Sequence, residues 1–192
     1  EEIIPVTDGE SVITEDGCIR PDATLDAMAR LNPVFTEGGS VTAATSSPLT
    51  DGAVAMIVCS EEFASQRGLK VMARIVSGAV SGCPPGIMGI GPVEATRKVL
   101  ERTGWGIETV DLFELNEAFS SQSMAVISEL GLDQTKINID GGALAIGHPL
   151  GASGARIVGK AANLLQRTKS NRAIATMCIG GGMGIAIALE SP

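Results

Sequence analysis

GGALAIGHPLGASGAR, residues 141–156, is the stretch that decides the fold, because it places the only histidine of the chain on a segment too rich in glycine for an ordinary helix or strand. Gly147 and Pro149 flank His148 on either side. Glycine allows backbone conformations and close approaches that a side chain would block, and proline fixes a turn. The stretch is therefore predicted to be a loop that presents one imidazole.

A second glycine-rich segment, MCIGGGMG at residues 177–184, carries the thiol of Cys178. It lies between two apolar runs, residues 173–176 and 185–189, which are predicted to be strands joined by a turn. Histidine and cysteine are the residue types of acyl and proton chemistry. Each also has a structural alternative, since most buried cysteines only fill space and many histidines only bond to the backbone.

Composition and charge limit the class of protein. The chain has 192 residues, of which 44% are hydrophobic and 19% charged, as is typical of a globular protein with a sizeable core. The net charge of -8, without a basic run or an aromatic ladder, argues against nucleic acid as a partner. No apolar run has the length of a membrane span, and no signal peptide is visible, so we expect a cytoplasmic or organellar-matrix protein.

The cysteines argue against a metal centre or a disulfide framework. They are widely spaced, with no Cys-x-x-Cys pair, and are Cys18, Cys59, Cys83 and Cys178. A structural zinc site needs paired spacing or more than one histidine. The sequence therefore predicts free thiols in a reducing compartment and no metal ligands.

Strand and helix patterns alternate from residue 51 onward, which predicts an α/β layer architecture closed by an antiparallel pair. Residues 1–50 are predicted to be loop-rich, with one short helix at 24–31, and residues 78–91 to be a Gly/Pro loop. The predicted strands are 53–60, 71–76, 110–115, 136–139, 173–176 and 185–189. The predicted helices are 61–67, 92–103, 116–131 and a helix after His148 with the face Ile157, Ala161, Leu164 and Leu165.

Three polar residues follow predicted strands: Asn116, His148 and Cys178. In open α/β sheets, the loops at the carboxyl ends of the strands gather at one edge, where ligands bind. We therefore predict that the three side chains converge. Asparagine is also a leading N-cap residue, so Asn116 has the alternative of capping the helix that follows it.

Taken together and in order, NEAF at 116–119, GHPLGASG at 147–154 and CIGGG at 178–182 resemble the three C-terminal signatures of the thiolases, which comprise the acetyl-CoA acetyltransferases and the 3-ketoacyl-CoA thiolases. MGIGP at 88–92 is similar to a further thiolase segment, and residues 41–53 are similar to the turn on the CoA side. The resemblance covers essentially the whole chain.

The resemblance implies the C-terminal half of a thiolase: an α/β fold with a mixed five-stranded sheet flanked by helices and a loop-rich N-terminal segment. Residues 1–50 would be the tail of a CoA-contacting loop domain, and residues 51–192 the C-terminal domain. In thiolases two similar halves pack together, so this half should expose apolar surface and self-associate. The complete protein is expected to be a homo-oligomer.

The implied reaction is the cleavage of a 3-ketoacyl-CoA by CoA, or the reverse Claisen condensation of two acyl-CoA molecules. By resemblance, His148 activates a nucleophilic cysteine and Cys178 moves the proton at the α-carbon. Asn116 holds a water beside the enolate oxygen, and the Gly180 amide contributes to the hole for the thioester oxygen; each such donor is worth about 3 to 4 kcal/mol. Cys178 would need a lowered pKa. Coenzyme A is a substrate, and no cofactor is implied.

The resemblance also implies substrate contacts and marks two departures. Ser47 and Arg20 would meet the pantetheine and nucleotide ends of CoA, and Met88 and Phe119 would bind substrate. The cysteine that accepts the acyl group belongs to a half that this chain lacks, so the chain alone is expected to be inactive. Residues 45–50, TSSPLT, are closer to the branch that degrades fatty acids, which favours a 3-ketoacyl substrate.

Two other classes remain open on the sequence. A non-catalytic CoA-binding or assembly module could have kept the thiolase loops for packing. A relative of the ketoacyl synthases would share the fold, but different residues would surround its histidine and it would lack the Cys-x-Gly loop.

Overall fold

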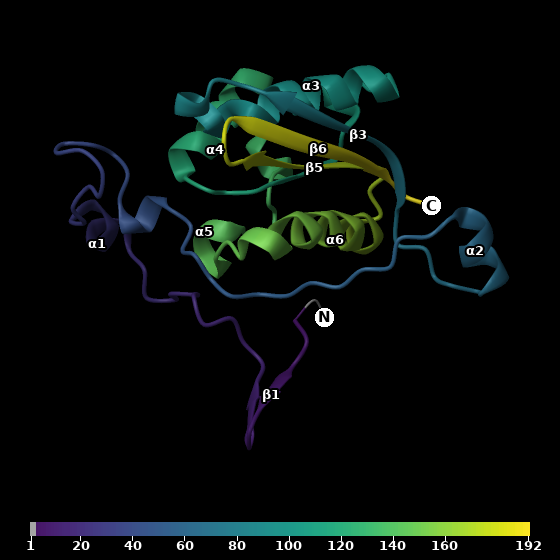
Figure 1. Ribbon diagram of the computed structural model, residues 1–192, viewed down its shortest axis with the longest axis horizontal. Helices are drawn as coiled ribbons and strands as arrows, with labels where there is room; N and C mark the ends of the chain where they lie inside the picture. The colour runs from purple at the N-terminus through teal and green to yellow at the C-terminus, as the bar shows by residue number, and fades with distance from the viewer. Residues whose placement is uncertain (1–2) are drawn as a thin grey trace.

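The computed structural model describes residues 3–192 and is built around a four-stranded mixed sheet with the strand order β3-β6-β5-β4 (Figure 1). The strands are β3 (Arg74–Gly82), β4 (Leu112–Leu115), β5 (Arg172–Ile179) and β6 (Met183–Glu190). β6 is antiparallel to both β3 and β5, while β4 is parallel to β5. The predicted α/β class with a mixed sheet is therefore confirmed, but among residues 3–192 this sheet has four strands and not the predicted five.

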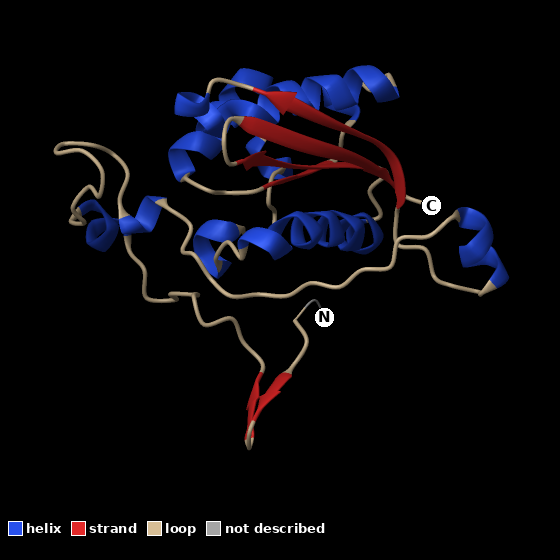
Figure 2. Ribbon diagram, in the orientation of Figure 1, coloured by secondary structure: helices blue, strands red, loops and turns tan. Residues whose placement is uncertain are grey.

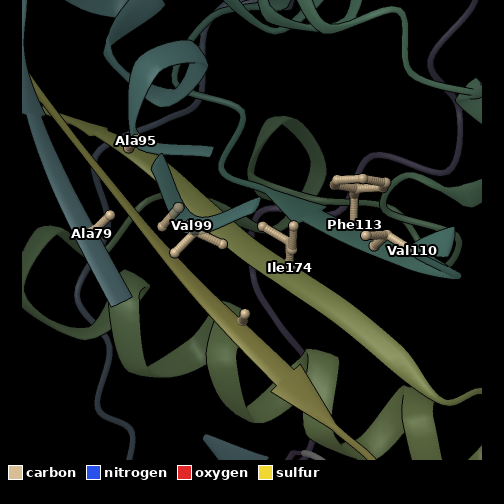
Figure 3. Close-up of a cluster of buried hydrophobic side chains, with 8 residues drawn as sticks. Ala79, Ala95, Val99, Val110, Phe113 and Ile174 are labelled. Carbon is tan, nitrogen blue, oxygen red and sulfur yellow. The ribbon is translucent and has the colours of Figure 1, made fainter. Parts of the chain in front are cut away.

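Helices cover both faces of this sheet (Figure 2). α3 (Gly91–Thr103) lies on one face, where its Val99 packs with Phe113 and Ile174 of the sheet (Figure 3). α6 (Leu150–Thr168) lies on the other face. Its buried apolar side chains are those predicted from the helical spacing: Ile157, Ala161, Leu164 and Leu165.

The remaining elements are short. α4 (Ser120–Leu130) packs beside α3, and α5 (Ala143–Ile146) precedes α6. The prediction that residues 141–156 form a loop is therefore wrong for 143–146 and from residue 150 onward, which are helical. The first part of the chain carries the hairpin β1 (Val6–Asp8) and β2 (Ser11–Ile13), then α1 (Leu25–Ala29) and α2 (Glu61–Gln66). The 3-10 helices are η1 (Ala43–Thr45), η2 (Pro85–Ile90), η3 (Ile107–Thr109) and η4 (Gln134–Lys136). Among residues 3–192, no helix combines the length and the apolar character needed to cross a bilayer.

The predicted strand at residues 53–60 is wrong. This segment has no strand partner among the described residues and runs in an extended form past the side of α6 that faces away from the sheet (Figure 1). Ile57 and Val58 on it are 83% and 68% exposed. A continuous apolar run indicates a strand that is buried on both faces. Residues 3–192 provide no neighbouring strand and no second layer for it.

Because this apolar segment is exposed, we expect the chain to self-associate in solution. Replacing Ile57 and Val58 with serine should shift sedimentation profiles toward the monomer, and Leu25→Ser, which removes an equally exposed side chain from α1, should not. A monodisperse monomer for the unaltered chain over a wide range of concentration would contradict this expectation.

The predicted strand at residues 136–139 is also wrong. η4 occupies the first of these positions, and only a single parallel bridge joins Ile137 to Phe113 at the edge of β4. Asn138 then takes a φ of 44°, and its side chain bonds to both the N–H of Leu115 (2.9 Å) and the C=O of Leu115 (2.8 Å). The Asn138 carboxamide thus bonds to the backbone groups of Leu115 that would otherwise pair with a fifth strand.

Three further boundaries differ from the prediction. β3 continues through residues 78–82, which were predicted to be loop, because β6 pairs with these small residues. Cys178 lies within β5, and the reversal is made by residues 180–182, where Gly181 and Gly182 have φ values of 84° and 90°. Asn116 does not cap α4, since the cap position is Phe119.

On α4, Val126 is fully buried, whereas Met124 is exposed. The predicted C-terminal ends of α3 and α4 are confirmed. α3 ends at Gly104 and α4 ends at Gly131, each in the left-handed conformation that glycine adopts without strain.

Gly104→Ala tests this helix ending. In the described part of the chain no atom lies within 4 Å of the added methyl group, so the cost is conformational, and we expect the free energy of unfolding to fall by about 1 kcal/mol. Gly86→Ala is the matched control, because it also adds a methyl group in open space but at a position without positive φ. Equal denaturation midpoints for the Gly104→Ala variant and the unaltered chain would contradict the expectation.

Candidate active site

Three strands of the sheet end at one edge. β3 and β5 are both antiparallel to β6, and β4 is parallel to β5, so β3, β4 and β5 point the same way. Asn116 follows β4 there, and its backbone N–H donates to the C=O of Thr176 at 3.0 Å. Cys178 lies two residues further along β5. Asn116 and Cys178 therefore lie at the same edge, as the sequence predicts.

His148 lies between α5 and α6 and also reaches this edge of the sheet. Its Nε2 lies 3.4 Å from Nδ2 of Asn116, and its Nδ1 lies 2.5 Å from Oγ of Ser153. The turn before it uses Gly147, at φ 95°, where a side chain would collide with Thr50. The structure thus brings Asn116 and His148 into contact. Ser153 was not predicted as a site residue from the sequence. The only signal for it there is its place in the GHPLGASG motif.

Glu117 is a second residue that sequence reasoning missed. Its Oε1 accepts a hydrogen bond from Nδ2 of Asn138 at 2.7 Å, and its Oε2 accepts one from the N–H of Leu144 at 3.0 Å. Gly142 packs so closely on this carboxylate that a Cβ there would lie 2.5 Å from it. Glu117 therefore ties the loop that carries Asn116 to α5, the helix that leads into His148.

Of the predicted substrate contacts, Ser47 and Phe119 lie against the site. The N–H and the hydroxyl of Ser47 both donate to the C=O of Ala118, at 3.0 and 3.1 Å, and Phe119 forms a bridge with Ser46. The C=O of Pro48 accepts from the backbone N–H of His148 at 2.9 Å. The segment around Ser47 is therefore bonded both to the loop that carries Asn116 and to the loop that carries His148.

Met88 and Arg20 are placed differently. Met88 is half-buried in η2, which follows β3 at the same edge of the sheet, and its C=O accepts a long hydrogen bond of 3.8 Å from the thiol of Cys83. Arg20 is exposed in the N-terminal segment, and within residues 3–192 no hydrogen bond or ion pair joins its side chain to the other site residues. The structure therefore brings Met88 to the site but not Arg20.

A cavity of about 370 Å³ opens next to His148, between residues 50–54 and the first turn of α6. Thr50 and Asp51 line one wall, and Pro149 with Leu150 lines the other. Within residues 3–192, no three His, Cys, Asp or Glu side chains are grouped closely enough to hold a metal ion. The site therefore offers a thiol, an imidazole and a carboxamide.

The two titratable groups of the site are both held toward their neutral forms. Burial raises the pKa of the Cys178 thiol, and the neighbouring Cys83 raises it further. Burial also lowers the pKa of His148, with the positive charge of Arg156 acting in the same direction. The expected lowering of the Cys178 pKa is therefore wrong, because removal from water outweighs stabilisation of the thiolate.

The lowered pKa of His148 has a measurable consequence. Titration of its ring signals by proton NMR, which the single histidine makes unambiguous, should give a midpoint below 6.5. In the window between that lowered value and 6.5 the unfolded chain binds more protons than the folded one, so the free energy of unfolding falls as the pH falls through it. A midpoint at or above 6.5 would contradict the burial of the ring.

Comparison with known protein families agrees with this geometry. The family model described as "Thiolase, C-terminal domain" matches residues 69–191, and the one described as "Thiolase, N-terminal domain" matches residues 1–62. The chain belongs to the thiolase family. The resemblance stated from the sequence is therefore confirmed, whereas the domain boundary at residue 50 stays a prediction.

Individual thiolases are similar over nearly the whole chain. An acetyl-CoA acetyltransferase of Paracoccus denitrificans is 48% identical over 196 residues, which cover 100% of this chain and 50% of that protein. A 3-ketoacyl-CoA thiolase of Aliivibrio salmonicida is 53% identical over 178 residues, or 91% of this chain and 46% of that protein. The chain thus spans about half the length of these relatives.

Solved thiolase structures share the fold. The human mitochondrial 3-ketoacyl-CoA thiolase in complex with CoA has a TM-score of 0.95 and 43% identity, covering 98% of this chain and 48% of its own. The acetyl-CoA acetyltransferase of Bacillus anthracis has a TM-score of 0.94 and 42% identity, covering 99% of this chain and 49% of its own. The thiolase fold of this chain is therefore confirmed.

Proposed function

We propose that this chain supplies the second half of a thiolase that cleaves 3-ketoacyl-CoA with CoA or runs the reverse Claisen condensation. The observation that carries the proposal is the contact between Asn116 and His148 at the sheet edge where β5 presents Cys178. Both relatives named above are acyltransferases by their names, which are acetyl-CoA acetyltransferase and 3-ketoacyl-CoA thiolase. The chain itself would be inactive, because the nucleophilic cysteine of thiolases lies outside it.

The proposed roles follow from the groups at the site. Burial favours the uncharged form of the His148 ring, which can take the proton of the nucleophilic thiol. Cys178, kept protonated by burial, can give a proton to the leaving carbanion and take one back in the reverse direction. The two neutral groups thus suit a reaction in which each moves one proton at a time.

The oxygen-stabilising groups are supplied by Asn116 and the turn after β5. The side chain of Asn116 is 0% exposed and its Oδ1 has no hydrogen-bond partner among residues 3–192, so it is suited to hold a water that in turn bonds to the enolate oxygen. Gly180 is exposed at the start of the turn, where its amide can face a thioester oxygen. Donors that are already aimed at the developing charge supply much of such catalysis.

We propose CoA and acyl-CoA as the ligands and no further cofactor. Ser47, Met88 and Phe119 lie where the pantetheine and acyl portions would pass, and Arg20 would meet the nucleotide end. One similar structure, the human mitochondrial enzyme, contains CoA. We further propose a role in fatty acid metabolism, a homo-oligomeric complete protein, and a location in the cytoplasm or an organellar matrix.

The test is thiolysis of acetoacetyl-CoA by the complete protein that contains this chain, or by this chain supplied with an N-terminal thiolase half in trans. We expect CoA-dependent loss of acetoacetyl-CoA and formation of acetyl-CoA. CoA binding without turnover would instead identify a non-catalytic CoA-binding or assembly module. The chain assayed alone is the control and should bring about no turnover.

A further inference from the structure

We propose that Ser153 is the positioning residue for His148: its hydroxyl accepts a hydrogen bond from Nδ1–H and so holds the ring in the tautomer whose Nε2 lone pair faces the site. This inference rests on the proposed function of His148 as the proton acceptor. It goes beyond that function by naming the group that decides which ring nitrogen is basic.

The direction of the hydrogen bond follows from the surroundings of the hydroxyl. Ser153 is 0% exposed, so water does not compete for it. Its Oγ lies 3.3 Å from the C=O of Pro149 and 2.5 Å from Nδ1 of His148. A carbonyl oxygen can only accept, and a hydroxyl has a single proton. When that proton goes to Pro149, the oxygen must accept from Nδ1, which therefore carries the hydrogen.

The other ring nitrogen is in surroundings that favour the same tautomer. Nε2 faces the amide Nδ2 of Asn116 at 3.4 Å, and an amide nitrogen is a donor. A lone pair on Nε2 suits this contact, whereas a hydrogen there would face another hydrogen. Two independent neighbours of the imidazole thus favour Nδ1–H with an unprotonated Nε2.

Ser153 is rigidly held. It lies in the first turn of α6, where its own N–H donates to the C=O of Pro149 at 2.9 Å. The next turns of this 19-residue helix are anchored by the buried Ile157 and Ala161. The orientation of the imidazole is thereby coupled to a helix with a buried inner face, and not only to the short turn that carries the histidine.

A hydroxyl partner differs from the carboxylate that orients many catalytic histidines. A carboxylate would stabilise the imidazolium and raise its pKa, whereas a neutral hydroxyl fixes the tautomer without adding charge. Ser153 therefore orients the ring and leaves it an uncharged base at neutral pH. This combination suits a group that must start the reaction unprotonated.

The test is nitrogen NMR of the imidazole, which the single histidine of the chain makes free of overlap. In the unaltered protein, Nδ1 should give the signal of a protonated ring nitrogen and Nε2 that of an unprotonated one. Ser153→Ala should shift the ring toward the Nε2–H tautomer or a mixture of the two, and Ser153→Thr, which keeps the hydroxyl, should not. Ser123→Ala, a matched change of a buried helical serine that does not touch the histidine, is the control.

Finding Nε2–H in the unaltered protein would overturn the proposal, even if the Ser153 variants fail to fold. An unchanged tautomer of His148 in the Ser153→Ala variant would also overturn the proposal. In the complete enzyme, Ser153→Ala should lower kcat by about 10- to 100-fold with little change in KM, a loss similar in size to that caused by removing the hydrogen-bond partner of a metal-binding histidine. Absence of thiolysis in the unaltered complete enzyme would overturn the proposed function and not the tautomer, so the two failures are distinguishable.

Discussion

Cys178→Ala in the complete protein is expected to lower the rate of thiolysis by about 10²- to 10⁴-fold, the usual contribution of a general acid or base. Alanine keeps the small volume that β5 needs at this buried position but removes the group that would exchange the α-proton. The KM for acyl-CoA should change little. Exchange of the α-protons of acetyl-CoA with solvent deuterium should be lost along with turnover.

Cys59→Ala is the matched control for this experiment. Cys59 is also a free cysteine, but it is exposed on the extended segment at residues 53–60, away from the sheet edge. The Cys59→Ala variant should retain full thiolysis activity. Equal thiolysis rates for the Cys178→Ala variant and the unaltered enzyme would remove Cys178 from the chemistry.

Glu117→Ala is expected to have the second-largest effect. The substitution removes two hydrogen bonds to a charged acceptor, one from Asn138 and one from the backbone of Leu144. Hydrogen bonds to charged groups contribute about 1.5 to 3 kcal/mol each, so the free energy of unfolding should fall by about 3 kcal/mol or more. Activity should fall as well, because α5 leads directly into His148.

Denaturant unfolding and thiolysis together check the expectation for Glu117. Glu101→Ala, which removes an exposed glutamate near the end of α3, should leave both unchanged. Glu117→Gln keeps one acceptor oxygen and should lie between the alanine variant and the unaltered protein. A Glu117→Ala variant with normal stability and normal activity would show that the two loops hold their places without this carboxylate.

Much of the fold could be predicted from the sequence, because it depends on local periodicity. The apolar spacing of Ile157, Ala161, Leu164 and Leu165 specifies one face of α6, and that face is the buried one. Gly104 and Gly131 mark the helix ends because they must adopt left-handed conformations. The glycine turn after Cys178 likewise specifies the hairpin of β5 and β6.

The errors arise where an outcome depends on a distant neighbour. Residues 53–60 are apolar enough for a buried strand, but a strand needs a partner, and residues 3–192 offer none. Residues 136–139 lose their pairing because the side chain of Asn138 bonds to Leu115 from 23 positions away. Neither event is visible in the period of the local sequence.

The site shows the same division. The residue types His148, Cys178 and Asn116 could be selected from motifs and strand ends, whereas Glu117 and Ser153 are recognised only by contacts between loops. The expected direction of the Cys178 pKa shift was wrong, because it was inferred from the role that the resemblance implies for the thiol, whereas the thiol is buried in β5 and burial raises its pKa. Burial is a property of the packed sheet and cannot be read from the role of a residue in a motif.

The most direct test is a crystal structure of the complete protein with an acyl-CoA bound. We expect the acyl thioester to lie in one pocket that contains both the Cys178 thiol and Nε2 of His148, with its oxygen facing the Gly180 amide. An acyl-CoA bound elsewhere, or a thiol and an imidazole that open into separate cavities, would contradict a shared site of acyl exchange.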